Sequence, residues 1–323
     1  MGVSYTYNFN TDLTANLKQF INRGAKEQAY VDSPALRLLE KRTVTLGSEY
    51  LQAAVSYCGT ALGGPYVDNT QVSTEDIETA TMAQYQPAFY AEPARVSHIQ
   101  LMKNKGPEAR FELWAHKVEQ AKMRLRKKLA TDYFATSQVT NGITGLPLAI
   151  PATTTSGTYG GLSRSTYTWW RNYTEVSLGA FATYGTDAMD NLINDIQTKT
   201  GRKPDYFVTT VDVLQEMQSL ARSNFRWDGP NRAGPYQAIL NDMAIEHISY
   251  AGAPVIADQY CDSGKIYAIR NDAMFLGVFE EFDVTPVIDL GATGVQGQVI
   301  FVRWGGQVLT TECRALGQIS DVT

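Results

Sequence analysis

The stretch PEARFELWAHKVEQAKMRLRKKLATDYFATS, residues 107–137, is the clearest helical pattern in the chain. Proline suits the first turn of a helix, and acidic residues near the start with basic residues in the second half complement the helix dipole. Apolar residues recur at spacings of three and four, as one helical face requires. They are Trp114, Val118, Ala121, Leu125 and Leu129. We therefore expect a helical rod of roughly 45 Å, with one narrow face on a sheet and the others facing solvent or partners.

The same helix carries a cluster of basic residues that invites a nucleic-acid hypothesis. These are Lys122, Arg124, Arg126, Lys127 and Lys128. Steps of about 100° per residue scatter them around the helix instead of lining one groove, and no aromatic residues that could stack on bases alternate with them. The formal net charge of −5 also opposes attraction to phosphate. The sequence predicts solvated cations, with pairing to acidic groups of a neighbouring subunit as the alternative.

The residues before this helix are rich in aromatic side chains but show no core of their own. The first 103 residues contain 11 of the 35 aromatics. Helices are predicted at 11–22 and from Ser33, which is a favourable N-cap followed by proline. Residues 43–57 and 81–102 resemble two strands, and Pro87 and Pro93 confine the second strand to an edge. Because an isolated hairpin is marginally stable in water, we expect these apolar groups to be buried against neighbouring molecules.

The second half of the chain alternates helix and strand signals. Helices are predicted at 186–200 and 211–222, with a strand at 205–209 between them. Several strands follow within 245–290. The segment 298–319 reads as two further strands joined by a turn at Gly305 and Gly306. Together with the hairpin, this predicts an α+β fold.

Motifs that would support catalysis are weak. The chain has three histidines and three cysteines, and none of them forms a recognised ligand or catalytic pattern with its neighbours. His98 is predicted to point outward from a strand. No apolar run approaches the roughly 20 residues of a membrane helix. We expect no catalytic, cofactor or metal site, and a structural protein that is not an enzyme. The alternative from another class is a soluble α/β hydrolase with scattered site residues.

Three segments resemble a known family. NGITGLPLAI (141–150), TYGGLSRSTYTWWRN (158–172) and YAGAPVIADQYCDSGKIYAIRNDAMFLG (250–277) are similar to the major capsid proteins of tailed bacteriophages, which have the Hong Kong 97-type shell fold. The order of the predicted elements is similar too, over essentially the whole chain. The resemblance implies an N-terminal arm at 1–42, an extended E-loop at 43–103, a peripheral domain at 104–174, an axial domain at 175–290, and return strands of the peripheral domain at 291–323. Within the peripheral domain, 107–137 is the spine helix and 145–170 is a surface strap.

The resemblance also implies a function. Such subunits assemble with themselves into hexamers and pentamers of an icosahedral shell that encloses packaged double-stranded DNA without reading its sequence. The expected location is the virion capsid, after assembly in the host cytoplasm and without a membrane.

No lysine lies between Lys41 and Lys103, so the isopeptide cross-link of some relatives is not expected, and the shell is held non-covalently or by a cement protein. Met1 favours a separate scaffolding protein, and a portal is a further expected partner. An encapsulin-like compartment, which encloses an enzyme, is the alternative within this architecture.

Aromatic residues and arginine are frequent at the centres of interfaces. On this basis the predicted inter-subunit contacts are Tyr50, Tyr85, Phe89, Tyr90, Trp114 and Arg126, and in the strap Tyr159 and Tyr167. Trp169 and Trp170 are expected to hold the strap against a neighbour or against the chain's own sheet.

Overall fold

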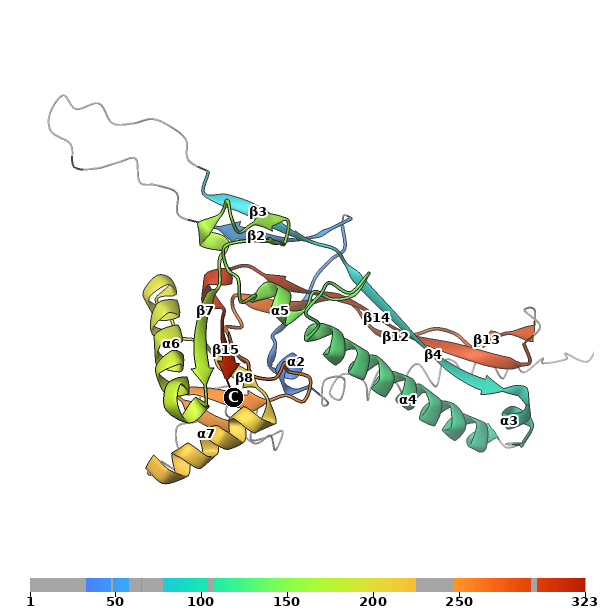
Figure 1. Ribbon diagram of the computed structural model, residues 1–323. Coiled ribbons are helices and arrows are strands. Elements are labelled where there is room, and N and C mark those ends of the chain that lie inside the picture. Colours follow the sequence, from blue (N-terminus) through green and yellow to red (C-terminus); the bar gives the residue numbers. More distant parts are fainter. Residues whose placement is uncertain are drawn as a thin grey trace, which may run out of the picture.

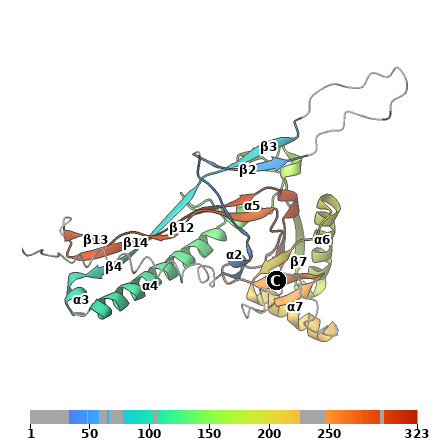
Figure 2. The same ribbon diagram turned by 180° about the vertical axis from the view of Figure 1, so that it is seen from behind.

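A computed structural model describes residues 33–47, 49–57, 65, 78–103, 107–224, 247–291 and 295–322. The molecule is elongated (Figure 1). A long helix lies along long strands on one side, and two shorter helices pack on a second sheet at the other end. A strand pair, β2 (Leu51–Ser56) and β3 (Ala80–Tyr85), projects between them. The view from behind shows the same separation of the two parts (Figure 2).

The helices follow local sequence signals closely. They are α2 (Pro34–Leu38), α3 (His98–Lys103), α4 (Pro107–Tyr133), α5 (Leu146–Ala149), α6 (Thr186–Thr200) and α7 (Val211–Asn224). The long helix is confirmed as α4, although it ends four residues earlier than predicted. Ser33 caps α2 as expected, and α6 stops at Gly201, whose φ of 74° is a left-handed conformation that glycine adopts easily. The helix predicted at 11–22 lies outside the described residues.

The first sheet lies against α4. Its strands are β1 (Lys41–Thr43), β12 (Met274–Val284), β14 (Gly297–Thr310), β13 (Ile288–Asp289) and β4 (Ala88–Ser97). The apolar residues predicted to form one face of α4 are all buried. They pack on alternate residues of the paired strands β4 and β14, such as Ala94 and Val96 of β4 and Ile300 and Trp304 of β14. The burial of one helical face on one sheet face organises this half of the molecule.

Gly305 and Gly306 do not form the predicted turn. They lie within β14, which continues to Thr310 and pairs with β4 on one side and β12 on the other. A Cβ atom at Gly305 would lie 2.3 Å from the ring of Phe279, and one at Gly306 would lie 2.8 Å from the carbonyl oxygen of Gly277. The glycines therefore allow side chains and backbone to approach closely in the middle of a strand.

The strand predicted to reach residue 102 ends earlier. Residues 98–103 form α3, so the expectation that His98 lies on a strand was wrong. Ser97 Oγ accepts a hydrogen bond from the Gln100 backbone N–H, and Gln100 Oε1 accepts one from the Ser97 N–H, each at 3.3 Å. This reciprocal pair is a capping box, which starts a helix directly after the strand.

The second sheet contains β7 (Tyr173–Gly179), β15 (Gly317–Val322), β11 (Ile266–Ile269), β8 (Tyr206–Thr209), β10 (Ala253–Ala257) and β9 (His247–Tyr250), in that spatial order. Residues of α6 and α7 share its apolar core. β12 belongs to the first sheet although the predicted axial segment 175–290 includes it, and β15 belongs to the second sheet although it was assigned to the return strands at 291–323. Residue 290 therefore does not separate the strands of the two sheets, because long-range pairing decides to which sheet each strand belongs.

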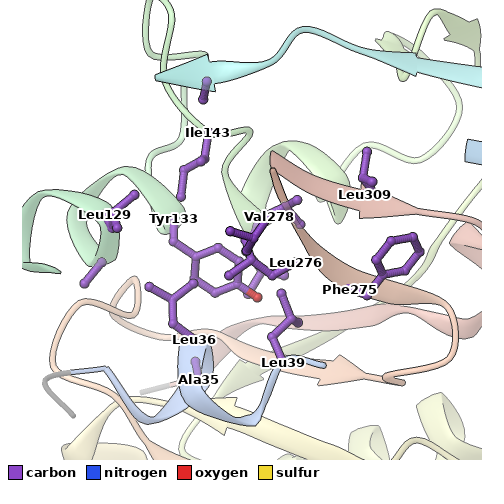
Figure 3. Packing of buried hydrophobic residues seen from close by; sticks show 14 of the residues in the cluster. Ala35, Leu36, Leu39, Leu129, Tyr133, Ile143, Phe275, Leu276, Val278 and Leu309 are labelled. Atoms are coloured by element: carbon purple, nitrogen blue, oxygen red, sulfur yellow. The ribbon is translucent and has the colours of Figure 1, made fainter. Parts of the chain in front are cut away.

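Helix α2 is anchored where the two halves meet. The Ser33 hydroxyl donates to Asp258 Oδ2 at 2.6 Å, and the Ala35 N–H donates to the same oxygen at 3.2 Å. Leu36 and Leu39 lie beside the ring of Tyr133 at the end of α4 (Figure 3). Burial raises the pKa of the Asp258 carboxyl, while its hydrogen bonds act in the opposite direction.

We expect Gly145→Ala to destabilise the subunit. Gly145 precedes α5, and a Cβ atom there would lie 2.3 Å from the carbonyl oxygen of Ala135, just beyond α4. A backbone clash of this kind costs about 1–3 kcal/mol, measurable as a lower midpoint of chemical or thermal unfolding. Gly47→Ala is the control, since its Cβ atom would meet nothing within 4 Å. Equal stability of the two variants would contradict this account.

Asp258→Asn tests the buried carboxylate at α2. The pKa of Asp258 in the folded protein lies above its ordinary value of 3.8. At a pH between these two pKa values the carboxyl is therefore protonated in the folded state and ionised in the unfolded state. This contribution to the free energy of unfolding grows as the pH falls from neutral through the folded pKa, and it levels off below about 4. The asparagine variant lacks it, so the native chain should gain stability relative to the variant over that range. Urea unfolding at a series of pH values measures the free energy of unfolding of the native chain and of the variant. If the native chain does not gain stability relative to the variant as the pH falls, the prediction is refuted.

Candidate inter-subunit surfaces

The β2–β3 hairpin has one buried and one exposed face. β2 (Leu51–Ser56) pairs antiparallel with β3 (Ala80–Tyr85), and burial alternates along β2. Residues 58–64 and 66–77, between the two strands, lie outside the described residues. The hairpin thus has the two-faced pattern of a strand pair that covers something on one side.

The strap at 145–170 covers that buried face. It contains α5, the short strands β5 (Thr158–Tyr159) and β6 (Leu162–Ser163), and the 3₁₀ turn Thr168–Trp170. Tyr85 contacts Tyr159 edge-on, with ring centroids 5.5 Å apart, and Tyr57 stacks on Trp169 at 4.4 Å. Trp170 is buried, and its Nε1 donates to the Tyr159 carbonyl oxygen at 2.9 Å. The expectation that these rings need a sister copy was wrong for the base of the hairpin, because the same chain covers them.

Four predicted contact residues have their side chains inside the chain's own core, which corrects their assignment to inter-subunit contacts. They are Tyr85, Trp114, Arg126 and Tyr159. Trp114 belongs to the buried face of α4, and Arg126 lies 3.8 Å from Glu119 on the same helix. The hydroxyls of Tyr85 and Tyr159 both hydrogen-bond Thr310, at 3.0 and 2.8 Å. Large aromatic and arginine side chains serve cores and interfaces alike, and here their burial within the chain leaves no surface for a partner.

The other four predicted contact residues keep exposed surface. Tyr50 is 43% exposed and Phe89 is 56% exposed. Tyr90 and Tyr167 are half-buried. The Tyr90 hydroxyl donates to Asp132 at 2.8 Å and accepts from the Ile143 N–H at 2.9 Å, and burial raises its pKa. Tyr90 therefore has a structural role at the end of α4, whereas Tyr50 and Phe89 present the most open aromatic surface of this set.

Phe89 lies on the face of the first sheet that points away from α4. We call this the open face, and it includes Phe89, Ala91, Pro93, Arg95, Phe279 and Arg303. Phe89 packs edge-on against Phe279, with ring centroids 5.0 Å apart. Within the described residues β4 pairs only with β14, so it forms an edge, and Pro93 lacks the N–H that another strand would need there. The open face thus offers side chains, more than backbone, to a partner.

A second apolar surface was missed by sequence reasoning. Ile99 and Met102 on α3 are 66% and 53% exposed, and Ile288 on β13 is 43% exposed. Both views place α3 and β13 at the end of the molecule far from α6 and α7 (Figures 1 and 2). The Ser-x-x-Gln signature of the capping box could have revealed the helix, and a short helix with apolar side chains and no core to cover indicates a contact site.

The basic residues of α4 divide into two groups. Arg124 contacts Glu92 at 2.5 Å and Lys128 contacts Asp132 at 2.8 Å, and both cations are exposed. Lys122 and Arg126 are buried, so the prediction of five solvated cations was wrong for these two. Burial lowers the pKa of Lys122, against the opposing effect of Glu119. The exposed cations of α4 are partly neutralised by the chain's own carboxylates.

Other kinds of site find little support in the part of the chain that the structure describes. These residues contain no group of three or more His, Cys, Asp or Glu side chains that could hold a metal ion. None of the helices among them is both long and apolar enough to cross a membrane.

Comparison with known proteins gives matches in structure but not in sequence. No family model matches the chain, and no curated protein matches it. The structure of the cyanophage A-1(L) capsid is similar at a TM-score of 0.69 and 16% identity, over 92% of this chain and 95% of that chain. The capsid of an empty GTA particle matches at 0.61 and 13% identity, over 91% and 90%. The capsid of Myoviridae phage XM1 matches at 0.56 and 12% identity, over 88% and 90%.

These matches extend over about nine tenths of the chain. They lend no support to the alternative of an α/β hydrolase. The predicted α+β fold is confirmed. The chain therefore has the fold of tailed-phage capsid subunits, the Hong Kong 97-type shell fold.

Proposed function

We propose that this protein is a major capsid protein, whose copies assemble into hexamers and pentamers of an icosahedral shell around double-stranded DNA. The observation that carries the proposal is the match of about nine tenths of this chain to about nine tenths or more of each capsid chain. An enzyme fold is built around a concave site, whereas this chain offers exposed apolar surfaces at separate places, namely the open face, the exposed face of the hairpin and the tip at α3. A subunit that contacts several neighbours at once needs such a distribution.

The charge of the chain suits a container for DNA. The net charge is −5, and carboxylates pair with exposed cations on α4, as Glu92 does with Arg124. Such a wall has little general attraction for phosphate, so DNA can be enclosed without being bound by sequence. We further propose that the shell forms non-covalently in the host cytoplasm, with a separate scaffolding protein, a portal and, in some contexts, a cement protein as partners.

Electron microscopy of the purified protein at increasing concentration tests this function. Shells or ring-shaped capsomers are the expected particles, because the open face and the hairpin surface need neighbours. Shells purified from a host should release nucleic acid on disruption. Shells filled with one protein in place of nucleic acid would instead indicate an encapsulin-like compartment, and particles that stay monomeric at high concentration would refute the proposal.

Phe89→Ser tests the open face. Because Phe89 is more than half exposed, its loss should lower the stability of the free subunit by no more than about 1 kcal/mol, while assembly should require at least a tenfold higher concentration. Light scattering during assembly measures the second effect and thermal unfolding the first. Met123→Ser on the outer face of α4, where Met123 is 51% exposed, is the matched control. If both variants assemble like the native chain, the open face is not an inter-subunit surface.

A further inference from the structure

We propose that each subunit fixes the direction of its own E-loop before it meets a neighbour, and that Gln307 is the positioning residue that ties the loop to the strap. This inference rests on the proposed function for its biological meaning, but its central claim concerns the free subunit. The sequence suggested the opposite arrangement, in which the apolar side chains of the arm are buried, and its orientation is fixed, only by a neighbouring copy.

Gln307 joins three separate segments through one buried amide. Its side chain is 1% exposed. Oε1 accepts hydrogen bonds from the N–H of Thr144, before the strap, at 2.7 Å and from the N–H of Val308 at 2.9 Å. Nε2 donates to the carbonyl oxygen of Gln86, between β3 and β4, at 2.6 Å. The amide supplies both an acceptor and a donor, so the glutamine at this position connects the foot of the E-loop to β14 and to the chain leading into the strap.

The residues on either side of Gln86 are fixed as well. The Tyr85 hydroxyl donates to the Thr310 carbonyl oxygen at 3.0 Å and accepts from the Thr310 N–H at 3.3 Å, within the core. Pro87 has a ring-restricted φ and also limits the residue before it to extended conformations. Three successive residues at the junction of the hairpin with β4 are therefore held by buried contacts or by covalent geometry.

The strap contacts both strands of the hairpin through a hydrogen bond and stacked rings. The Gln84 N–H donates to the Gly160 carbonyl oxygen at 2.9 Å. Gly160 has a φ of +58°, and a Cβ atom there would lie 2.9 Å from the Tyr85 hydroxyl oxygen. The stacked rings of Tyr57 and Trp169 fasten the other strand. The hairpin is thus attached along both strands, and every one of these contacts lies within one chain.

A pre-oriented arm has a consequence for assembly. Ordering a flexible segment during association costs free energy that reduces the net affinity. When the segment is already ordered in the free subunit, that cost is removed from the association step. Contacts of modest strength, such as those available to Tyr50 and Phe89, then suffice to hold neighbours together.

Gln307→Glu is the variant that separates the tether from the rest of the core. An ionised glutamate keeps the two acceptor bonds to Thr144 and Val308 but loses the donor to Gln86, and its carboxylate then faces a carbonyl oxygen. Because burial raises the pKa of a carboxyl and a protonated acid would restore the donor, the variant is measured at alkaline pH. Gln84→Glu makes the same chemical change on the exposed face of β3 and serves as the matched control. Tyr85→Phe removes the hydroxyl that contacts Thr310 and Tyr159, and it is the second variant if Gln307→Glu fails to fold.

The direction of the hairpin can be measured as a distance between two spin labels by double electron–electron resonance. Labels are attached through Ala54→Cys on the exposed face of β2 and Thr131→Cys on α4, in a chain carrying Cys58→Ser. Cys261 and Cys313 are buried, and burial raises the pKa of the Cys313 thiol to about 12, so both native thiols react slowly with the label. The same labelled chain is measured as a free subunit and in assembled particles.

We expect one narrow distance distribution in the native free subunit, centred where it is in assembled particles. Gln307→Glu should at least double its width and slow assembly about tenfold, whereas Gln84→Glu should change neither. A broad native distribution that narrows only on assembly, or an unchanged distribution in both Gln307→Glu and Tyr85→Phe, would overturn the inference. Absence of any assembled particle by electron microscopy would count against the proposed function alone, because the free-subunit distances are measured independently of it.

Discussion

The packing of one face of α4 against one face of the first sheet is the contact on which the rest of the structure depends. Trp114 and Leu125 are completely or almost completely buried there, beside alternate residues of β4 and β14. A strand presents alternate side chains to opposite faces, so a single helix covers only half of each strand. The other half forms the open face with Phe89. An elongated subunit with a covered and an uncovered side follows directly, and it cannot hide its whole apolar surface within one chain.

Local signals explain what the sequence predicted correctly. The bounds of α6, the cap of α2 at Ser33 and the apolar face of α4 each depend on residues within a turn or two of helix. The capping box at Ser97 and Gln100 was equally local but stood in an alternating, proline-containing segment, and it was overlooked. Long-range pairing was beyond this kind of reasoning. Nothing near β12 or β15 indicates that the two strands lie in different sheets from the ones their sequence positions suggest.

The predicted contact residues also depend on strand pairing that local sequence signals do not reveal. Tyr85 and Phe89 lie four residues apart in similar surroundings, yet one is in the core and the other is more than half exposed. Pro87 separates β3 from β4 between them, and each strand has its own register with a different partner. Since a shift of one residue exchanges the two faces of a strand, residue type alone cannot separate core from interface. Gly305 and Gly306 were predicted as a turn for a related reason, because the groups that approach them, the Phe279 ring at Gly305 and the Gly277 carbonyl oxygen at Gly306, come from another strand.

The composition of the strap now has a physical explanation. A segment rich in threonine, glycine and aromatic residues is too polar to form a core and too aromatic to be a flexible linker. Gly160 and Gly161, both with positive φ, close the β5–β6 turn, and Tyr159 and Trp169 face the hairpin with their rings. The strap is therefore a platform for the chain's own arm. In the proposed shell the two sets of contacts therefore have different roles. Contacts within one chain fix the orientation of the hairpin, and contacts between chains bind a hairpin that is already ordered.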